Sequence, residues 1–325
     1  MHKFVRSLIT EWRKLDLPFA DEIVVVAVSG GADSMSLLLA VHDLAERKKL
    51  AHRVIVVHFN HGLRGSDSDE DERFVKEHAE RLGFEFVVGS ASPAKRGNLE
   101  QAARNARYKF LTRIASENDA LAVLVAHTQN DQAETLLFNL IRGSGLAGLA
   151  GMRHVRELEE GMLLVRPLLS WATRSDTEEF CRHNETEYRT DLMNEDERYS
   201  RVRIRRDILP RLAEMNPRII ETLARTADLM QRSSDLATSD FTGDASGKLS
   251  IKGLKAQESL DLYATLRSWL RAKRGNLRSL QLKHIEAIER LILSPKSGKT
   301  VELPGGGRVV KEAGSLRFTN IKVEK

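Results

Sequence analysis

The chain has almost no cysteine: Cys181 is the only one among 325 residues. A single cysteine cannot close an intramolecular disulfide, nor can it supply the thiolate cluster of a zinc or iron–sulfur centre. Long apolar runs are missing as well, because no stretch reaches the ~20 residues that a membrane span needs. The apolar start of the chain is interrupted at Arg6 and Ser7, unlike a secretory signal. These absences predict a cytoplasmic protein without a membrane segment.

Apolar and charged residues are plentiful, at 41% and 30% of the sequence. The apolar residues recur in short blocks, such as 23–26 and 54–57, so the composition excludes a disordered chain. A length of 325 residues exceeds one ordinary core and predicts two domains, or one large domain with an appendage.

The charge is unevenly distributed along the chain. Residues 1–216 hold 31 Lys and Arg against 34 Asp and Glu, whereas residues 217–325 hold 20 against 12, and the net charge is +5. Asn216-Pro217 is a natural boundary, because the residue before a proline is biased out of the helical conformation. We therefore expect a slightly acidic domain over 1–216 and a basic appendage over 217–325 that binds a polyanion.

The first half of the sequence alternates between strand-length apolar blocks and longer helical patterns. This rhythm is typical of repeated βαβ units and predicts an α/β fold with a doubly wound, mostly parallel sheet. The expected strands are 23–28, 53–59, 84–88, 121–126 and 162–165, and the expected helices are 35–47, 69–82, 99–117 and 131–142. Ligands bind beyond the carboxyl ends of such strands, so the loops after residues 28, 59 and 126 are the expected site.

From Ser175 onward the pattern is mainly helical, with Ser175 and Glu178 spaced as a capping box. The polar stretch 193–206 predicts a loop with an Arg-rich end. Further helices are expected at 218–238, 256–273 and 278–293, and short β-hairpins at 299–323. The appendage is therefore predicted to be a smaller, mainly helical domain that ends in hairpins.

A glycine-rich loop follows the first predicted strand. It reads Ser-Gly-Gly-Ala-Asp-Ser at residues 29–34, between a strand ending at Val28 and a helix beginning near Met35. Two adjacent glycines let the backbone pass close to a phosphate, and the hydroxyls with the free N–H groups of the helix start make an anion site. Asp33 suits a Mg²⁺ ion carried by the phosphates. The structural alternative is a glycine turn with an aspartate cap.

This loop resembles that of the PP-loop, or N-type ATP pyrophosphatase, family, whose members cleave ATP between the α- and β-phosphates and adenylate their substrates. The resemblance implies an adenine nucleotide alpha hydrolase-like fold. Further segments look like those of the tRNA(Ile)-lysidine synthetase branch, namely residues 57–64, 98–108, 126–149 and 166–169. The resemblance covers residues 20–212, and the tail more faintly.

A defined reaction is implied by this resemblance. With ATP and Mg²⁺, the enzyme adenylates the oxygen on carbon 2 of the wobble cytidine in an isoleucine tRNA with a CAU anticodon, and pyrophosphate is released. Free L-lysine then displaces AMP to give lysidine, so that the tRNA gains isoleucine identity and decodes AUA. The sequence leaves open a homodimer.

The same segments imply the site residues. Those for ATP are Ser29, Gly30, Gly31, Ala32, Asp33, Ser34, His58, Arg104 and His127, with Asp33 also the Mg²⁺ ligand. The lysine ligands are Asp131 and Glu134, and the tRNA ligands are Arg64, Arg201, Arg203 and Arg205. The expected catalytic residues are Asp33, Asp131, Glu134, Arg201 and Arg205.

Some of these residues have structural alternatives. Asp131 and Glu134 lie three residues apart at the start of a predicted helix, so both carboxylates share one face, where either could orient or deprotonate lysine. Alternatively, both are acids that favour the helix dipole. Arg104 could reach phosphate or tRNA, whereas Arg107 and the acidic run 67–72 are expected to be solvated helix residues.

The Arg-rich loop departs from the family pattern at two positions. Met193 replaces a serine and Val202 replaces an asparagine, while Asp191, Asn194, Arg201 and Arg205 match it. Guanidinium groups there suit the negative charge of an adenylate or a tRNA phosphate.

Competing functions remain open from the sequence. His58, His61 and His127 at strand ends could bind zinc, although no cysteine accompanies them. A tRNA thiolase would use cysteines, whereas Cys181 lies in an amphipathic pattern that predicts burial. A small-molecule ligase, such as an NAD or GMP synthetase, fits the basic tail poorly. A non-catalytic tRNA-binding module would not need an intact loop at 29–34.

Overall fold

The computed structural model describes residues 1–60, 66–90, 99–189, 200–238, 247–277 and 279–320. The chain forms two compact units. Residues 1–138 and 152–227 make up the first unit, and residues 139–151 and 228–325 the second. Within the described ranges, no helix is long and apolar enough to cross a membrane.

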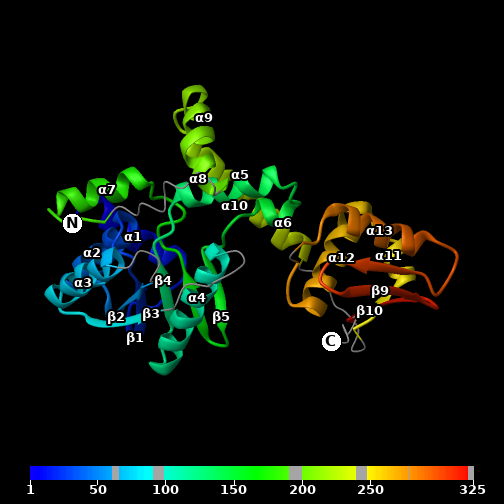
Figure 1. Cartoon of the computed structure of the whole chain (residues 1–325), viewed down its shortest axis with the longest axis horizontal. Helices are drawn as coiled ribbons and strands as arrows, with labels where there is room; N and C mark the ends of the chain where they lie inside the picture. The colour runs from blue at the N-terminus through cyan, green and yellow to red at the C-terminus, as the bar shows by residue number, and fades with distance from the viewer. Residues whose placement is uncertain (61–65, 91–98, 190–199, 239–246, 278, 321–325) are drawn as a thin grey trace. The chain divides into compact units, whose positions relative to one another are not determined.

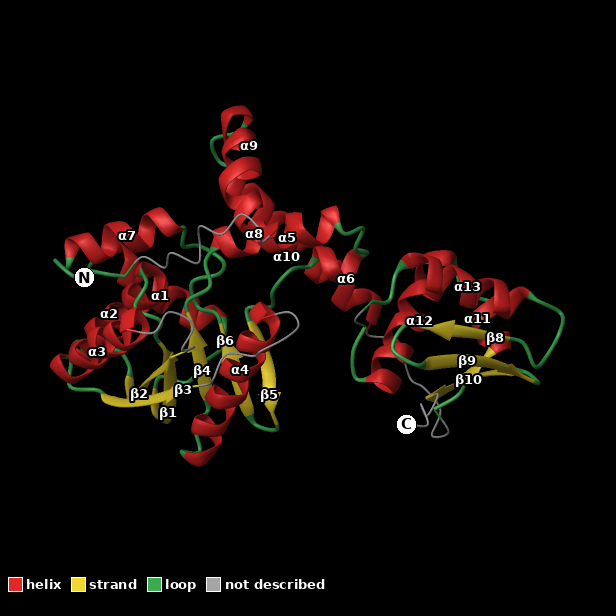
Figure 2. Cartoon of the chain, in the orientation of Figure 1, coloured by secondary structure: helices red, strands yellow, loops and turns green. Residues whose placement is uncertain are grey.

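A six-stranded sheet with the order β3-β2-β1-β4-β6-β5 is the centre of the first unit (Figures 1 and 2). Its strands are β1 (Ala20–Ala27), β2 (Ala51–Asn60), β3 (Glu85–Ser90), β4 (Ala122–Val125), β5 (Val155–Glu159) and β6 (Met162–Val165). All neighbours are parallel except β5, which pairs antiparallel with β6 at the edge. This confirms the predicted fold class. The sequence prediction missed β5, because an edge strand with exposed charged residues carries no apolar block.

Both faces of this sheet are buried, which explains the continuous apolar runs of its strands. Successive residues of β1 face opposite sides: Val24 and Val26 belong to one core and Val25 to another. The first core includes residues of α1 (Lys3–Lys14), α2 (Ala32–Glu46), α3 (Ser66–Arg81) and α7 (Arg174–His183). The second is covered by α4 (Leu99–Glu117).

A smaller core of the first unit joins α5 to the segment after residue 200. The elements are α5 (Gln129–Ile141), α8 (Ser200–Arg203), a π-helix (Ile204–Ile208), α9 (Leu209–Met215) and α10 (Ile219–Thr238). Leu136, Ile204, Leu209 and Ala227 are buried in this core. It holds the Arg-rich segment against α5.

Two local predictions from the sequence are wrong. The capping box of α7 is formed by Thr173 and Asp176, not Ser175 and Glu178: Thr173 N donates to the Asp176 carboxylate at 2.8 Å, and Asp176 N donates to Thr173 Oγ1 at 3.2 Å. The Arg-rich end of the expected loop is helical from Ser200. Its arginines are exposed or half-buried, and their number masks the helical spacing of the buried residues Val202, Ile204 and Leu209.

The second unit packs helices on one antiparallel sheet, with the strand order β7-β10-β9-β8. Its helices are α6 (Leu146–Leu149), α11 (Ile251–Lys255), α12 (Ser259–Arg274) and α13 (Leu282–Leu293), and its strands are β7 (Leu249–Ser250), β8 (Thr300–Leu303), β9 (Gly307–Glu312) and β10 (Ser315–Asn320). Leu266 and Trp269 of α12, Ile288 of α13, Val309 and Leu316 form its core. The predicted hairpins exist, joined in a single sheet.

The division between the units differs from the sequence boundary. Asn216-Pro217 coincides with the break between α9 and α10, whereas the compact units divide within α10, between Ala227 and Asp228. Residues 139–151 also belong to the second unit. The first part of α10 is thus built into the first unit through Ala227.

Candidate active site

The carboxyl ends of β1, β2 and β4 meet at one edge of the parallel sheet, where β1 has β2 on one side and β4 on the other. A pocket of about 610 Å³ lies there. Its lining includes Val28, Phe59 and Ala126, the residues at the three strand ends that the sequence singled out. It also includes Ser29, Gly31, Ala32, Asp33, Ser34, His58, Arg107, His127, Asp131 and Arg205.

The loop at residues 29–34 is shaped as an anion cradle. Gly30 has a φ of +91°, which glycine adopts without strain. Ser34 Oγ accepts a hydrogen bond from Ser29 N at 3.1 Å and donates one to Gly31 O at 2.9 Å, so this hydroxyl closes the loop. The N-cap residue of α2 is Gly31, so no capping side chain bonds the N–H groups of the first helical turn. The N–H groups of the first helical turn are therefore available to an anion.

Asp33 lies in the first turn of α2 and is held from α7. Thr177 Oγ1 donates to Asp33 Oδ1 at 2.5 Å, and Arg174 Nε lies 4.0 Å from Oδ2. Burial, and after it the carboxylate of Asp131, raise the pKa of Asp33 to about 6, against the effects of Thr177 and Arg174. Two carboxylates from α2 and α5 thus repel each other across the pocket, an arrangement that a divalent cation would relieve.

Asp131 caps α5 with one oxygen and faces the pocket. Its Oδ2 accepts hydrogen bonds from Thr128 N at 2.8 Å and Thr128 Oγ1 at 3.2 Å. Within the described chain, Oδ1 accepts no hydrogen bond. One oxygen of Asp131 therefore caps the helix, as the dipole interpretation expects, while the functional interpretation stays a prediction.

His127 is a neutral hydrogen-bond donor in this pocket. Arg166 Nε donates to His127 Nδ1 at 3.1 Å, which leaves the ring proton on Nε2. Burial lowers the pKa of His127 to about 3, and the neighbouring arginines lower it too, against the opposing effect of Asp131. The imidazole cannot gain a second proton near neutral pH.

Glu134 and Arg205 form a bidentate ion pair. Arg205 Nε and Nη2 donate to Glu134 Oε1 and Oε2 at 2.6 and 3.0 Å. Glu134 is only 3% exposed and does not line the pocket, whereas Arg205 does. Although three residues apart on α5, Asp131 and Glu134 thus have different surroundings.

A wall of arginines surrounds Tyr108 on α4. The guanidinium carbons of Arg104, Arg107 and Arg156 lie 5.1, 5.5 and 5.5 Å from its ring centre. Burial alone would raise the pKa of Tyr108, but the positive charges of Arg104, Arg107 and Arg166 together lower it by more. The pKa of Tyr108 is therefore lowered. Among the described residues, no carboxylate forms an ion pair with these four arginines. Arg107 brings this positive charge into the pocket that holds the anion cradle, where it suits phosphate groups.

Comparison with known proteins assigns the family. Residues 4–212 match the PP-loop domain, and residues 249–317 match the TilS substrate binding domain. The tRNA(Ile)-lysidine synthase of Salinispora tropica is 36% identical over 304 residues, which cover 90% of this chain and 89% of that protein. The chain belongs to the tRNA(Ile)-lysidine synthase family.

Other family members are longer. The tRNA(Ile)-lysidine synthases of Solibacter usitatus and Geobacter sulfurreducens are 37% and 36% identical over 87% and 91% of this chain, which spans 64% of the length of each. Among solved structures, a U34-tRNA thiolase, NcsA from Methanococcus maripaludis, has a TM-score of 0.58 at 17% identity, covering 70% of this chain and 79% of that one. This likeness shows a shared fold.

Not all lysidine-synthase residues expected from the sequence reach the pocket. Arg104 belongs to the arginine wall but does not line the pocket, Arg201 lies over the ring of Phe138 at 5.7 Å, and Arg203 is exposed. Gly30 and Glu134 do not line the pocket either, and His61, Arg64, Asp191, Met193 and Asn194 lie outside the described residues.

Several residues that line the pocket or support it were not predicted from the sequence. Arg107, expected to be solvated, lines the pocket, and so does Asp71 of the acidic run, which is 9% exposed. Arg189 N donates to Gly30 O at 2.9 Å, and its guanidinium lies 3.7 Å from Asp71, so this residue fastens α3 to the anion cradle. Arg107 lies within the segment 98–108 that resembles the family, so its role could have been predicted. Arg174 and Arg189 lie outside the segments that carry this resemblance.

The structure bears on the sulfur alternative, whereas the zinc alternative includes His61, which lies outside the described residues. Within the described residues, no three His, Cys, Asp or Glu side chains group as a metal site. Cys181 is buried, and this burial raises the pKa of its thiol to about 12. The thiol therefore stays protonated and is a poor nucleophile for the sulfur transfer that a thiolase would need.

Proposed function

We propose that this chain uses ATP to join L-lysine to carbon 2 of the wobble cytidine of a CAU-anticodon isoleucine tRNA in the cytoplasm. The products are lysidine in the tRNA, AMP and pyrophosphate. The observation that carries the proposal is one pocket of about 610 Å³ that combines the anion cradle, the carboxylates of Asp33 and Asp131, and several arginines, among them Arg107 and Arg205. Membership of the tRNA(Ile)-lysidine synthase family supports it.

ATP is proposed to bind with its phosphates on the loop at 29–34. Adenine fits the apolar part of the pocket, where Phe59, Leu111 and Ala126 lie. His58 Nδ1 donates to Val28 O at 2.8 Å, and burial lowers the pKa of His58, so its Nε2 is a hydrogen-bond acceptor. Such an acceptor suits the exocyclic amine of adenine.

A Mg²⁺ ion fits the donor set beside this loop. Asp33 would hold it, because its carboxylate lines the pocket and its pKa is raised by burial and by the nearby charge of Asp131. When bound, it would supply positive charge to the phosphates.

The adenylation step places negative charge where the pocket is cationic. When the cytidine oxygen attacks the α-phosphorus, charge develops on that phosphate and on the departing pyrophosphate. Arg107, Arg205 and the Nε2–H of His127 line the pocket and can donate hydrogen bonds to those oxygens. We propose that Glu134 acts by positioning Arg205.

The second step needs a neutral lysine amine. Asp131 Oδ1, which faces the pocket without a hydrogen bond from the described chain, is proposed to receive the ammonium group and take its proton. Both oxygens of Glu134 are occupied by Arg205, so this carboxylate is not the proposed lysine ligand.

The decisive experiment measures pyrophosphate release and lysine incorporation with ATP, labelled lysine and tRNA carrying the CAU anticodon. Pyrophosphate release should require the tRNA, and one lysine should be incorporated for each pyrophosphate. Asp131→Asn should abolish incorporation, while Asp119→Asn, which removes an exposed carboxylate outside the pocket, should not. Release that depends on tRNA without incorporation of lysine would disprove the lysidine function and retain only the adenylation.

A further inference from the structure

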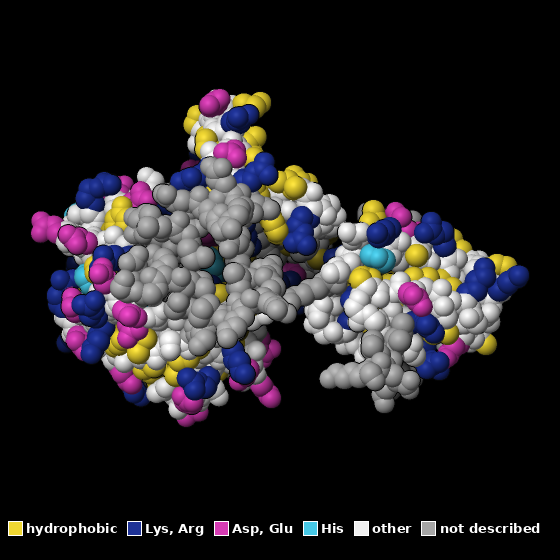
Figure 3. Space-filling view, viewed as in Figure 1, with side chains coloured by type: hydrophobic (Ala, Val, Ile, Leu, Met, Phe, Trp, Pro, Cys, Tyr) yellow, Lys and Arg dark blue, Asp and Glu magenta, His cyan; other side chains and the backbone are white. Residues whose placement is uncertain are grey.

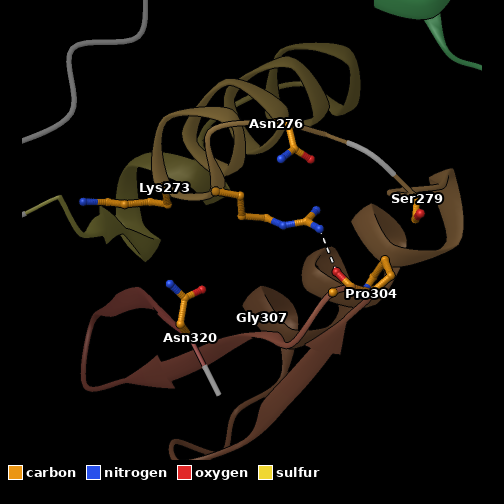
Figure 4. Close-up of a pocket in the computed structure, with 8 residues that line it drawn as sticks. Lys273, Asn276, Ser279, Pro304, Gly307 and Asn320 are labelled. Carbon is orange, nitrogen blue, oxygen red and sulfur yellow. Dashed lines mark hydrogen bonds between the residues drawn. The ribbon is translucent and has the colours of Figure 1, made fainter. Parts of the chain in front are cut away.

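The second unit contains a pocket of its own, at the carboxyl end of α12 (Figure 4). Its volume is about 260 Å³. The polar side chains that line it are Lys273, Arg274, Asn276, Ser279 and Asn320. They come from the end of α12, the segment that follows it, and the end of β10.

The walls of this pocket are held together by a hydrogen bond between two elements. Arg274 Nη2 in the last turn of α12 donates to Pro304 O at 2.7 Å. Pro304 begins the turn between β8 and β9, in which Gly305 and Gly306 have φ values of +84° and +83°. Because glycine tolerates this conformation, the turn can close tightly against the helix end.

The lining of the pocket is suited to an anion. It contains two cationic groups, two amides and a hydroxyl, and no carboxylate. In Figure 4 the side chains of Asn276 and Asn320 point from opposite sides toward the space between them, while the side chain of Lys273 extends away from that space. The helix dipole alone accounts for basic residues in the last turn of α12, but it does not account for two amides that converge from different elements.

The surroundings favour nucleic acid over a small anion. Lys and Arg side chains are spread over the visible face of this unit (Figure 3). Residues 249–317, which match a substrate binding domain, include every polar residue of the lining except Asn320. An open pocket with amide and hydroxyl donors can bind the oxygens of a phosphodiester together with a neighbouring ribose hydroxyl.

We propose that this pocket binds a backbone phosphate of the tRNA substrate. Lys273 and Arg274 supply positive charge, and the amides of Asn276 and Asn320 hold the phosphate and its ribose. The inference rests on the proposed function, because it takes tRNA to be the substrate.

The test uses the full chain and two variants of the pocket. Asn320→Asp keeps the side-chain size but opposes an anion, and Lys273→Gln removes one charge at the edge. Matched controls are Gln257→Glu and Lys283→Gln, which make the same charge changes at exposed positions of the same unit outside the pocket. The dissociation constant for tRNA is measured at several salt concentrations, and thermal unfolding confirms that each variant is folded.

We expect Asn320→Asp to weaken tRNA binding roughly tenfold, as for loss of a charge-assisted contact. Lys273→Gln should weaken it less and lower the slope of log Kd against log salt by about one. If Asn320→Asp does not fold, Lys273→Gln alone tests the proposal. Equal effects of the pocket variants and their controls would overturn it. The net charge of the unit, and not the pocket, would then account for the change in tRNA affinity.

Inorganic phosphate distinguishes the source of the anion. If phosphate raises the unfolding temperature of the parent chain but not of Asn320→Asp, while both bind tRNA equally, the pocket takes a free anion and the proposal is wrong. The proposed function fails separately: absence of lysine incorporation by the parent chain would leave the tRNA affinities of these variants unchanged.

Discussion

At the scale of the residue, Asp33 is kept in an environment that costs folding energy. Burial and the neighbouring Asp131 raise its pKa from 3.8 to about 6. Such a carboxyl group takes up protons more readily in the folded state than in the unfolded one. Its ionisation therefore destabilises the fold as the pH rises from about 3.8 to about 6, and the cost stays constant above that pH.

The first prediction concerns Asp33→Asn. This variant should be more stable than the parent chain at pH 8, by about 2 kcal/mol, because the cost of ionisation is removed. The difference should shrink as the pH falls through 6 and vanish below about 4. Urea unfolding at several pH values in the absence of nucleotide measures it.

The same variant should lose pyrophosphate release. Thr177→Val serves as the control, because it removes the hydroxyl that donates to Asp33 but keeps the carboxylate. It should retain measurable activity. A variant Asp33→Asn that kept full turnover would refute the role of Asp33 at the phosphates.

At the scale of the element, the pairing of Glu134 with Arg205 fastens α5 to the π-helix at Ile204–Ile208. Arg205 and Arg206, both within this π-helix, line the pocket. π-helical turns are rare and are frequently found at functional sites. The sequence predicted a loop here and therefore did not place these arginines. Their position is set by Ile204 and Leu209, which pack against α5.

The second prediction concerns this ion pair. Glu134→Gln should destabilise the chain by roughly 3 kcal/mol, because it removes the negative charge that pairs with the guanidinium of Arg205. It should also lower kcat while the KM for lysine changes little. Arg205→Lys should have the same kinetic effect, and the double variant should lose no more than either single one, which a double-mutant cycle measures. A large rise in the KM for lysine with Glu134→Gln alone would instead make Glu134 a lysine ligand.

At the scale of the whole molecule, the sequence divides into a slightly acidic part and a basic appendage, but the structure changes where the appendage can be removed. Because the appendage over residues 217–325 is basic, its removal should reduce tRNA affinity more than ATP binding. Such a cut would also remove Ala224 and Ala227, which are 3% and 0% exposed in the first unit. The loss of that packing would confuse the two effects.

The third prediction uses a cut after Thr238, which retains α10. The truncated chain should bind ATP with an affinity within a few-fold of the parent chain. Its tRNA affinity should fall by at least an order of magnitude, with a weaker salt dependence, because most of the basic residues of the appendage are gone. Fluorescence titrations with a labelled nucleotide and with tRNA measure both. Equal losses would show that the charge division has no functional meaning.

The sequence by itself determined the alternation of the parallel strands with helices and the place of the anion cradle after the first strand, because each depends on residues close together in the chain. The pairing of Glu134 with Arg205, the contact of Thr177 with Asp33 and the entry of Arg107 into the pocket were decided only by the tertiary structure. These contacts depend on how separate helices pack on the sheet. A local pattern records which face of a helix is buried, but not which side chain of another helix meets it there.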